Sequence, residues 1–287
     1  MTIATIDIGG TGIKFASLTP DGKILDKAST ATPETLEELL AWLDQRLSER
    51  DYRGIAMSVP GAVHQETGVI EGISAIPYIH GFSWYEALAH HKLPIHLEND
   101  ANCVGLSELL AHPEIENAAC VVIGTGIGGA MIINGKLHRG RHGLGGEFGY
   151  MTTIEPAERL NNWSQLASTG NMVRYVIEKS GQTDWDGRKV YQEAAAGNAL
   201  CQEAIERMNR NLAQGLLNIQ YLIDPDVISL GGSISQNPDF IKGVQKAVDA
   251  FVERYEEYTI APVIQACTYQ ADANLYGALV NWQIAQI

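Results

Sequence analysis

The chain has 287 residues, of which 45% are hydrophobic and 19% charged, and its formal net charge is −14. These proportions are those of a soluble globular protein, and the length allows two lobes, each with a core of its own. The acidic balance repels phosphate backbones and so argues against nucleic acid as a partner, and no apolar run is long enough to cross a membrane.

The first third of the chain predicts strands alternating with helices. Strands are expected at residues 2–8, 12–18, 23–29, 54–61 and 95–99, and helices at 33–49, 83–91 and 101–112. Pro33 is expected to open the first helix, and Asn99 or Asp100 to cap the last. A Pro-Asp-Gly turn at residues 20–22 joins the second and third strands.

The rest of the chain repeats this order. Residues 120–140 predict strand, glycine-rich turn, strand, Asn-Gly turn and strand, the order also found in residues 5–27. Further helices are expected at 164–179, 188–196, 198–222 and 238–256, with strands at 227–230 and 262–267 and a last helix from Ala273. The repeat is either a duplicated unit or two hairpins with the same turn chemistry. Two such halves of alternating strands and helices predict an α/β fold of two lobes around a cleft.

The first glycine-rich stretch, IDIGGTGIKF, places an acid at the end of a buried strand. Gly9, Gly10 and Gly12 either form a tight hairpin or expose backbone N–H groups to phosphate oxygens. It is not a Walker motif, because G-x-x-x-x-G-K-[ST] does not occur in the chain. Asp7 either holds Mg²⁺ through water or accepts hydrogen bonds from the loop. Lys14 either offsets phosphate charge or is an exposed strand residue.

The second glycine-rich stretch, VVIGTGIGGAMI, has the same form. Two such turns at the mouths of repeated sheets favour a clamp for a polyphosphate between the lobes. A third glycine pair, Gly231 and Gly232, follows the buried strand VISL. This pair is either a strand-to-helix turn, with Ser233 capping the next helix, or a seat for adenosine.

Polar residues outside the glycine turns suggest a site for a second substrate. Asp100 is either a helix cap or a general base that takes a proton from an attacking hydroxyl, and Asn99 would then bond a neighbouring hydroxyl. Glu147, in the stretch GRHGLGGEFGYM, is either a solvated loop acid or a carboxylate that accepts two sugar hydroxyls. Gly61 ends the stretch SVPG, which either closes a strand or exposes N–H groups to a ligand.

The cysteines and the N-terminus indicate neither a secreted nor a zinc-knuckle protein. None of the four cysteines is spaced as C-x-C or C-x-x-C, so we expect free thiols in a reducing cytosol. The N-terminus lacks a basic region followed by an apolar one, so we expect no secretory signal and a cytoplasmic location.

Taken in order, the motifs DIGGTGIK, SVPG, ENDANC, GTGIGGA, GEFGYM and LGGSIS closely resemble those of the ROK family of sugar kinases and sugar-responsive repressors. The resemblance runs from residue 3 to about residue 280. It implies a two-lobed, actin-like fold of duplicated ribonuclease-H type, with ATP and Mg²⁺ between the lobes. By this resemblance the first phosphate motif is Asp7, Gly9, Gly10 and Thr11, the second is Gly124, Thr125, Gly126 and Gly128, and the adenosine motif is Gly231 and Gly232. Asp100 matches the catalytic base, and Asn99 and Glu147 match sugar contacts.

Two departures from the family pattern lie on the sugar side. Tyr150 stands where the family commonly has a histidine that binds sugar and ligates zinc. Residues 155–171 contain no cysteine, so the family's zinc loop has no counterpart and we expect no zinc site. Tyr150 offers a stacking face and one hydroxyl, and we count it with Gly61 among the sugar contacts and Lys14 among the nucleotide contacts. A GEFGYM motif without the zinc loop is most similar to the bacterial β-glucoside kinases of the family.

We therefore predict an ATP-dependent sugar kinase, in which O6 of a hexose or β-glucoside gives its proton to Asp100 and attacks the γ-phosphoryl group. The alternative is a sugar-binding sensor of the same family with weak or no catalysis, because both departures concern the sugar. A nucleotide-driven interaction protein, like the larger actin-fold ATPases, is a third hypothesis, which the short chain disfavours.

The sequence also predicts how the chain is divided and what it binds. We expect an N-terminal lobe of residues 1–115, completed by a C-terminal helix at 273–287, and a second lobe of residues 116–272. The expected ligands are ATP, Mg²⁺ and a small sugar, and the resemblance implies a homodimer. The repressor branch carries a DNA-binding domain before the first glycine motif, and since the first strand here begins at residue 2 or 3, we expect no DNA binding.

Overall fold

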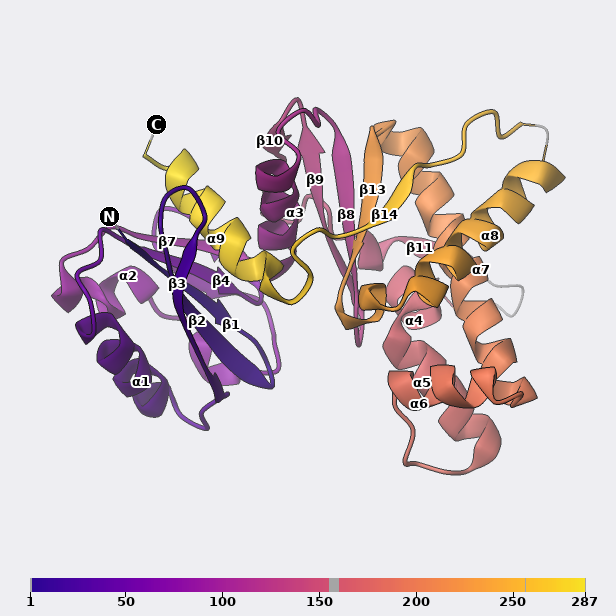
Figure 1. The fold of residues 1–287 in the computed structure, drawn as a ribbon, viewed down its shortest axis with the longest axis horizontal. Coiled ribbons are helices and arrows are strands. Elements are labelled where there is room, and N and C mark those ends of the chain that lie inside the picture. The colour runs from indigo at the N-terminus through magenta and orange to yellow at the C-terminus, as the bar shows by residue number, and fades with distance from the viewer. Residues whose placement is uncertain (1, 155–159, 256, 287) are drawn as a thin grey trace. The chain divides into compact units, whose positions relative to one another are not determined.

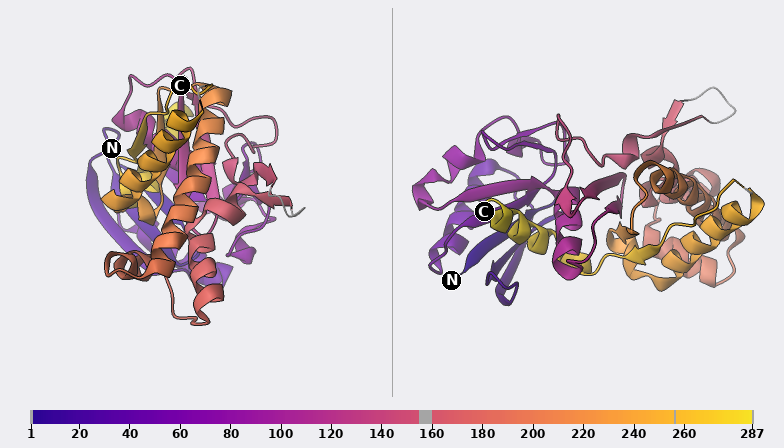
Figure 2. Two further views of the ribbon diagram at one scale, coloured as in Figure 1. Left: turned by 90° about the vertical axis from the view of Figure 1, so that its right-hand side faces the viewer. Right: turned by 90° about the horizontal axis from the view of Figure 1, so that it is seen from above.

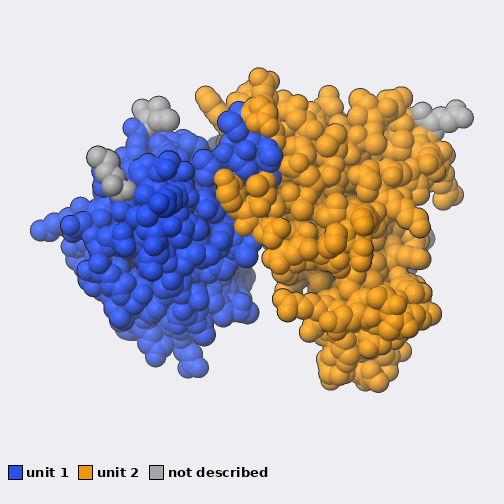
Figure 3. Space-filling model, in the orientation of Figure 1, with its two compact units in different colours: residues 1–113, 139–145, 271–287 blue, residues 114–138, 146–270 orange. Residues whose placement is uncertain are grey.

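The computed structural model describes residues 2–154, 160–255 and 257–286, and Figure 1 shows them as a ribbon. The chain folds into two units, which Figure 3 shows in different colours, and unit 1 is assembled from segments far apart in the sequence. Unit 1 comprises residues 1–113, 139–145 and 271–287, and unit 2 comprises residues 114–138 and 146–270.

Unit 1 is built on a five-stranded sheet in the order β3-β2-β1-β4-β7. The strands are β1 (Ile3–Ile8), β2 (Gly12–Leu18), β3 (Ile24–Ala31), β4 (Ile55–Val59) and β7 (Ile95–Asn99). β2 pairs antiparallel with β1 and β3, whereas β4 pairs parallel with β1 and β7. The carboxyl ends of β1, β4 and β7 therefore lie at one edge of the sheet, where α/β proteins commonly bind their ligands.

Helices cover both faces of this sheet (Figures 1 and 2). They are α1 (Leu36–Ser48), α2 (Trp84–Ala87), α3 (Asp100–Ala111) and α9 (Ala273–Ile284). On one face, α1 buries Leu39, Leu43 and Leu47 in a core with β1 and β4. On the other face, α9 packs against α3 and the sheet. Gly277 permits this packing, because a Cβ there would overlap the carbonyl group of Cys103.

Short elements complete unit 1. They are the hairpin of β5 (Ala62–His64) and β6 (Val69–Glu71), and the 3₁₀ turns η1 (Pro77–Ile79) and η2 (Ala89–His91). A further 3₁₀ turn, η5 (Gln270–Asp272), precedes α9.

Unit 2 contains a second sheet with the same order and directions, β10-β9-β8-β13-β14. Its strands are β8 (Ala118–Ile123), β9 (Ile127–Ile133), β10 (Lys136–Leu137), β13 (Val227–Gly231) and β14 (Ile264–Ala266). β9 pairs antiparallel with β8 and β10, and β13 pairs parallel with β8 and β14. The α/β fold is thus confirmed, and the short sequence repeat at the starts of the two sheets reflects a repeated topology rather than turn chemistry alone.

The helices of unit 2 form one large apolar core with its sheet. They are α4 (Trp163–Ala167), α5 (Thr169–Ser180), α6 (Gly187–Ala195), α7 (Ala199–Ile223) and α8 (Pro238–Arg254). α7 and α8 lie side by side (Figure 2). The shorter elements are η3 (Phe148–Tyr150), η4 (Ser233–Gln236) and the hairpin of β11 (Thr152–Ile154) and β12 (Leu160–Asn162). Of the helices in the described parts of the chain, none is both long enough and apolar enough to span a membrane.

Three details of the predicted helices are wrong, each because a side chain caps a helix at another residue. The first helix begins at Leu36, not at Pro33, since Thr35 Oγ1 accepts a hydrogen bond from Glu38 N at 3.3 Å. The helix expected over 164–179 is two helices, because Ser168 ends α4 and caps α5.

The third detail concerns the adenosine motif. Ser233 does not cap the next α-helix but lies in η4, and Asn237 caps α8 instead. Residues 155–159, where the segment lacking the zinc loop begins, lie outside the described residues.

Candidate functional site

Three buried polar side chains form a row across the parallel strands of unit 1. Asp7 on β1 pairs with Ser58 on β4, and Ser58 pairs with Glu98 on β7. Paired residues on neighbouring strands point to the same face of a sheet. This face is the one that α9 covers, and Asn274 of α9 donates to both Asp7 Oδ1 and Ser58 Oγ, at 2.9 and 3.0 Å. The row lies near the carboxyl edge of the sheet, so it can position the loops that follow the strands.

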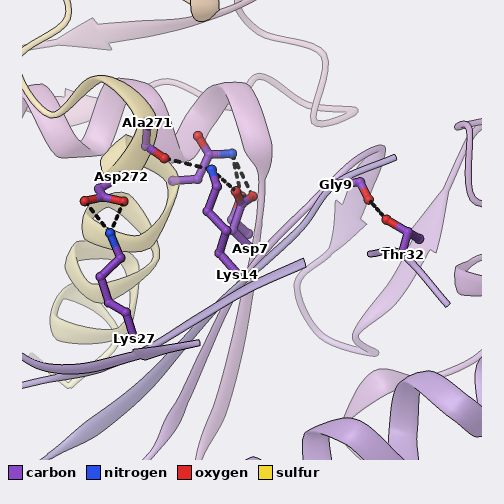
Figure 4. Close-up of polar contacts among 9 residues, drawn as sticks. Asp7, Gly9, Lys14, Lys27, Thr32, Ala271 and Asp272 are labelled. Atoms are coloured by element: carbon purple, nitrogen blue, oxygen red, sulfur yellow. Dashed lines mark hydrogen bonds and ion pairs between the residues drawn. The ribbon is translucent and has the colours of Figure 1, made fainter. Parts of the chain in front are cut away.

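Asp7 is held by three side-chain donors, of which Figure 4 labels Lys14. Ser58 Oγ donates to Oδ1 at 3.1 Å, together with Asn274, and Lys14 Nζ donates to Oδ2 at 3.2 Å. Lys14 also donates to the carbonyl oxygen of Ala271 at 2.7 Å, so it is a partner of Asp7 rather than a plain exposed strand residue. An ionised carboxylate has about four lone-pair directions. Three donors leave about one direction for a further partner such as a metal-bound water.

The first glycine turn closes tightly on itself. Gly9 N donates to Gly12 O at 3.1 Å, and a Cβ on Gly9 would lie only 2.9 Å from that oxygen. Thr32 Oγ1 donates to the carbonyl oxygen of Gly9 at 2.5 Å, which ties the turn to the end of β3 (Figure 4). Gly10 and Thr11 at the tip are exposed. The turn therefore needs glycine for its own shape, and its contact with phosphate stays a prediction.

Asn99 and Asp100 lie where β7 meets α3, and their side chains hold one another. Asn99 Oδ1 accepts a hydrogen bond from Asn102 N at 3.1 Å, so Asn99 is the helix cap. Its Nδ2 donates to Gly61 O at 3.1 Å and to Asp100 Oδ1 at 3.0 Å, and Ala101 N donates to the same Oδ1 at 2.8 Å. The structure thus brings the predicted residues Gly61, Asn99 and Asp100 together. The helix N-terminus favours the ionised carboxylate that a general base requires.

An ion pair between a buried carboxylate and a partly exposed arginine supports this loop. Glu98 is 2% exposed, and Arg139 donates from Nε to its Oε2 at 2.7 Å. The other oxygen, Oε1, accepts from Asn99 N and from Asn102 Nδ2, both at 2.9 Å. Arg139 also donates to Asn281 of α9 at 3.0 Å. Sequence reasoning missed this network, because its members come from three distant segments; the only signal was the acid at the start of ENDANC.

The second glycine turn joins β8 to β9 in unit 2. Gly124 N donates to Gly126 O at 2.9 Å, which closes this turn as the corresponding bond closes the first. Gly170 near the start of α5 packs on it, since Gly170 N donates to Gly124 O at 3.1 Å and a Cβ on Gly170 would lie 2.5 Å from Thr125 O. The three turn residues are exposed, and Gly128 follows on β9. A helix N-terminus beside an exposed glycine turn is an arrangement suited to phosphate.

The predicted adenosine motif lies against this turn. Gly231 ends β13, and Gly232 has a φ of +89°; a Cβ there would overlap the carbonyl group of Ile123, the last residue before the second glycine turn. A cavity of about 620 Å³ adjoins the motif. Its lining residues are Thr169, Asp186, Gly187, Arg188, Tyr191, Ser233, Ile234, Gln236 and Asn237.

Two residues that line this cavity carry buried hydroxyls. Thr169 Oγ1 and Tyr191 Oη have no hydrogen-bond partner among the described residues. Burial raises the pKa of the Tyr191 hydroxyl, so this group stays neutral and can donate or accept. Unpaired buried polar groups are costly, and a polar aromatic base would supply their partners.

The GEFGY motif forms the turn η3 and packs beside the start of β9. Phe148 is buried in the core of unit 2, and Gly149 lies so close to the carbonyl of Ile127 that a Cβ would overlap it. Phe148 and Gly149 therefore fix the backbone directly after Glu147, and Gly145 and Gly146 directly precede it. Burial raises the pKa of Glu147, although the residue is only half-buried. Tyr150 is 72% exposed, so its ring is available to a ligand.

Each unit therefore gathers a set of the predicted residues. Unit 1 holds Asp7 and Lys14 with the first glycine turn, and Gly61, Asn99 and Asp100 around the start of α3. Unit 2 holds the second glycine turn, the adenosine motif with its cavity, and Glu147 with Tyr150. The first set offers a fixed carboxylate for proton transfer, and the second offers backbone and hydroxyl groups for a nucleotide.

Comparison with known proteins adds four similarities. The ROK family model matches residues 3–284. A β-glucoside kinase of Listeria monocytogenes is 34% identical, covering 98% of this chain and 97% of that protein, and a glucokinase of Halalkalibacterium halodurans is 28% identical, covering 86% and 84%. Among solved structures, a ROK family protein from Streptococcus pneumoniae in complex with sucrose is 87% identical, with a TM-score of 0.96 over 100% of this chain and 99% of that one.

Proposed function

This chain belongs to the ROK family, and from that premise we propose that it transfers the γ-phosphoryl group of ATP to O6 of a hexose or a β-glucoside. The observation that carries the proposal is the end-to-end similarity to a β-glucoside kinase, 34% identity over 98% of the chain. The similarity to a glucokinase also supports a sugar kinase.

The preferred sugar is a glucoside whose anomeric carbon carries a second group. The 87% identical structure is a complex with sucrose, in which the glucose ring is substituted at that carbon. Tyr150 supports the same choice, because an exposed aromatic ring can stack on the apolar face of a sugar or of an aryl group. Glu147 is proposed to accept sugar hydroxyls, and Asn99 keeps one lone pair on Oδ1 for a hydroxyl donor beyond its bond from Asn102 N.

The cavity beside Gly231 and Gly232 is the proposed place of the adenosine group. Its volume of about 620 Å³ is in the range of small-molecule sites. The hydroxyls of Thr169 and Tyr191 would bond the base, and the turn from Gly124 to Gly126 would meet the phosphates.

Asp7 is the proposed holder of Mg²⁺, acting through a metal-bound water. The fit rests on its three side-chain donors, which fix the carboxylate and leave about one lone-pair direction unused. When bound, the ion would neutralise charge on the phosphates. Lys14, which lies 3.2 Å from Asp7, would add a second positive charge at the same place.

Asp100 is the proposed general base. The sugar hydroxyl would pass its proton to this carboxylate as its oxygen attacks the γ-phosphorus in line, and the bond from that phosphorus to the bridging oxygen would break to leave ADP. Asn99 and Ala101 both donate to Oδ1, which fixes the plane of the carboxylate before substrate binds. Such preorganisation is what general-base catalysis requires.

The test is sugar-dependent ADP release with Mg·ATP, measured for glucose, N-acetylmannosamine, fructose, cellobiose and an aryl β-glucoside. We expect turnover with at least one glucose-containing sugar and a preference for the glucosides. Turnover with unsubstituted glucose alone would overturn the choice of substrate but not the kinase. If no sugar stimulates ADP release while sugar binding is still detected, the chain is a sugar-binding sensor instead.

A further inference from the structure

Two histidines and an aspartate meet on unit 1, among residues to which the proposed kinase site assigns no role. Asp44 comes from α1, and His90 and His91 come from the turn η2. Both imidazoles contact one oxygen, Asp44 Oδ1, at 3.0 Å from His90 Nε2 and 2.7 Å from His91 Nε2. The possible ligand atoms of the three residues all lie within 4.8 Å of one another. Among the described residues this is the one group of three such side chains that converges so closely.

The backbone of η2 brings the two imidazoles to the same point. Adjacent residues normally point in different directions, but the two rings lie with centroids 4.2 Å apart and both Nε2 atoms turned to Asp44. The turn ends at Lys92, whose φ of 56° is in the left-handed region that few residues adopt. The left-handed residue turns the chain toward β7 directly after the two histidines.

The spacing is close to that of ligands around a small divalent ion. Nitrogen and oxygen ligands at about 2.1 Å in a tetrahedral site lie about 3.4 Å from one another. The two contacts with Asp44 Oδ1, at 3.0 and 2.7 Å, are hydrogen-bond distances and are shorter than this. Small side-chain rotations would therefore admit an ion. Each neutral imidazole would move its proton from Nε2 to Nδ1, so that the Nε2 lone pair faces the ion without loss of a proton.

The donor set selects the class of ion. Two imidazole nitrogens and one carboxylate oxygen suit Zn²⁺ and its neighbours Co²⁺, Ni²⁺ and Cu²⁺, whereas Mg²⁺ prefers six oxygen ligands. His91 has a side chain only 16% exposed, and His90 one that is 56% exposed. An ion held by these three residues would keep an open position on the side of solvent, which water can fill.

We propose that Asp44, His90 and His91 bind a divalent transition-metal ion, with Zn²⁺ as the physiological choice by availability and geometry. The ion fastens α1 to η2, which lies four residues before β7 begins at Ile95. It thereby stabilises the part of unit 1 just before β7, the strand that ends next to Asp100. The alternative, in which the two imidazoles only donate hydrogen bonds to Asp44, predicts no ion binding.

The experiment is direct titration of the full chain with Zn²⁺, by calorimetry and by competition with a chromophoric chelator. We expect one equivalent to bind, with affinity reduced at least 10-fold in Asp44→Asn and in His91→Gln. His64→Gln is the matched control, since His64 is also a surface histidine with a side-chain partner, Thr67, but lies outside the group. The four cysteines are all buried, so the folded chain offers Zn²⁺ no competing thiol at its surface.

A second readout separates loss of the site from loss of the fold. Co²⁺ bound by nitrogen and oxygen ligands gives visible absorption bands that report its coordination, and circular dichroism of each variant checks that it is folded. We expect the bands in the wild-type chain and in His64→Gln, and their loss in folded Asp44→Asn. The proposal is overturned if the wild-type chain binds no Zn²⁺, or if Asp44→Asn and His91→Gln bind it as tightly as the wild-type chain does.

Discussion

At the scale of single residues, Asp100 carries the proposed chemistry. Its Oδ1 accepts hydrogen bonds from Asn99 and Ala101, and an asparagine side chain can keep this acceptor while losing the basic carboxylate. We expect Asp100→Asn to reduce turnover roughly 10²-fold or more and to leave sugar affinity within a few-fold of normal. Steady-state ADP release and sugar binding by calorimetry, measured on the same preparation, provide the check. Near-normal turnover in this variant would remove Asp100 from the role of base.

Glu147 gives a prediction about the pH dependence of stability. Burial raises the pKa of Glu147 in the folded state above its ordinary value of 4.5. At pH values between the unfolded-state pKa and the folded-state pKa, the folded state therefore binds more protons than the unfolded state. Its stabilising contribution is therefore complete below the unfolded pKa and is lost as the pH rises through the folded pKa. Glu147→Gln has no such loss. We expect the free energy of unfolding of Glu147→Gln, minus that of the wild-type chain, to increase between pH 4 and pH 7.

Asp184 supplies a control of opposite sign for that measurement. Its hydrogen bond from Lys189 lowers its pKa below 3.8, so its contribution to stability is present at neutral pH and is lost as the pH falls. In urea titrations, the free energy of unfolding of Asp184→Asn minus that of the wild-type chain should become more negative from pH 3 to pH 7. A difference for Glu147→Gln that stays constant, or that falls with pH, would contradict the effect of burial on Glu147.

At the scale of elements, the network of Glu98 and Arg139 joins β7, the segment 139–145 and α9. Arg139→Met removes the cation from a carboxylate that is 2% exposed; since the Arg139 side chain is itself 33% exposed, we expect a cost below the about 3–5 kcal/mol of a fully buried pair. In the double variant, Glu98→Gln together with Arg139→Met, the buried carboxylate that would lack its cation is replaced by a neutral amide. The amide oxygen of this glutamine can still accept the hydrogen bond from Asn99 N. We therefore expect the double variant to be more stable than Arg139→Met alone.

Urea unfolding of the wild-type chain, both single variants and the double variant measures this coupling as a thermodynamic cycle. Because the network positions Asn99 and Asp100, folded Arg139→Met should also show reduced turnover with little change in nucleotide affinity. Additive losses in the two single variants would mean that Glu98 and Arg139 do not act as a pair.

The elements that the sequence predicted well are those whose signals are local. The glycine turns, the buried strands and the long helix α7 each carry a pattern within one short window, and Asn134 and Gly135 adopt the positive φ values of 52° and 68° that an Asn-Gly hairpin turn needs. The hairpin of β5 and β6 was not predicted, because its strands are only three residues long. The break at Ser168 was missed because the apolar spacing continues across it, while one hydroxyl caps α5.

The site was predicted in part for the same reason. Gly61, Asn99 and Asp100 lie at the carboxyl ends of β4 and β7, and residues at the carboxyl ends of parallel strands meet at one edge of the sheet. Asn274 could not be predicted, since it reaches Asp7 from 267 residues further along the chain. Arg139 likewise reaches Glu98 only because the segment 139–145 returns to unit 1. Partners of this kind depend on the assembled fold and leave no mark in the sequence around either residue.

At the scale of the whole molecule, unit 1 is assembled from the two ends of the chain and a short segment between them. Its sheet is made entirely of residues before 100, yet one of its faces is covered by α9 at the C-terminus. Unit 1 therefore cannot complete its core until all of unit 2 has been synthesised. The same closure brings Asn274 to Asp7, so the last helix also completes the proposed metal and phosphate end of the sheet.

This assembly predicts that truncation after residue 270 destroys unit 1. The large apolar side chains Leu275, Leu279, Val280 and Trp282 are each at most 8% exposed, and burial of such a side chain contributes about 1.5–3 kcal/mol. Their sum, about 6–12 kcal/mol, is comparable with the whole stability of a typical domain, about 5–15 kcal/mol. We expect the chain of residues 1–270 to lose the cooperative unfolding of unit 1, and limited proteolysis to digest residues before 113 first. A chain ending at Ile284 retains α9 and is the matched control. Equal protease resistance of the two truncated chains would mean that the sheet of unit 1 folds without α9.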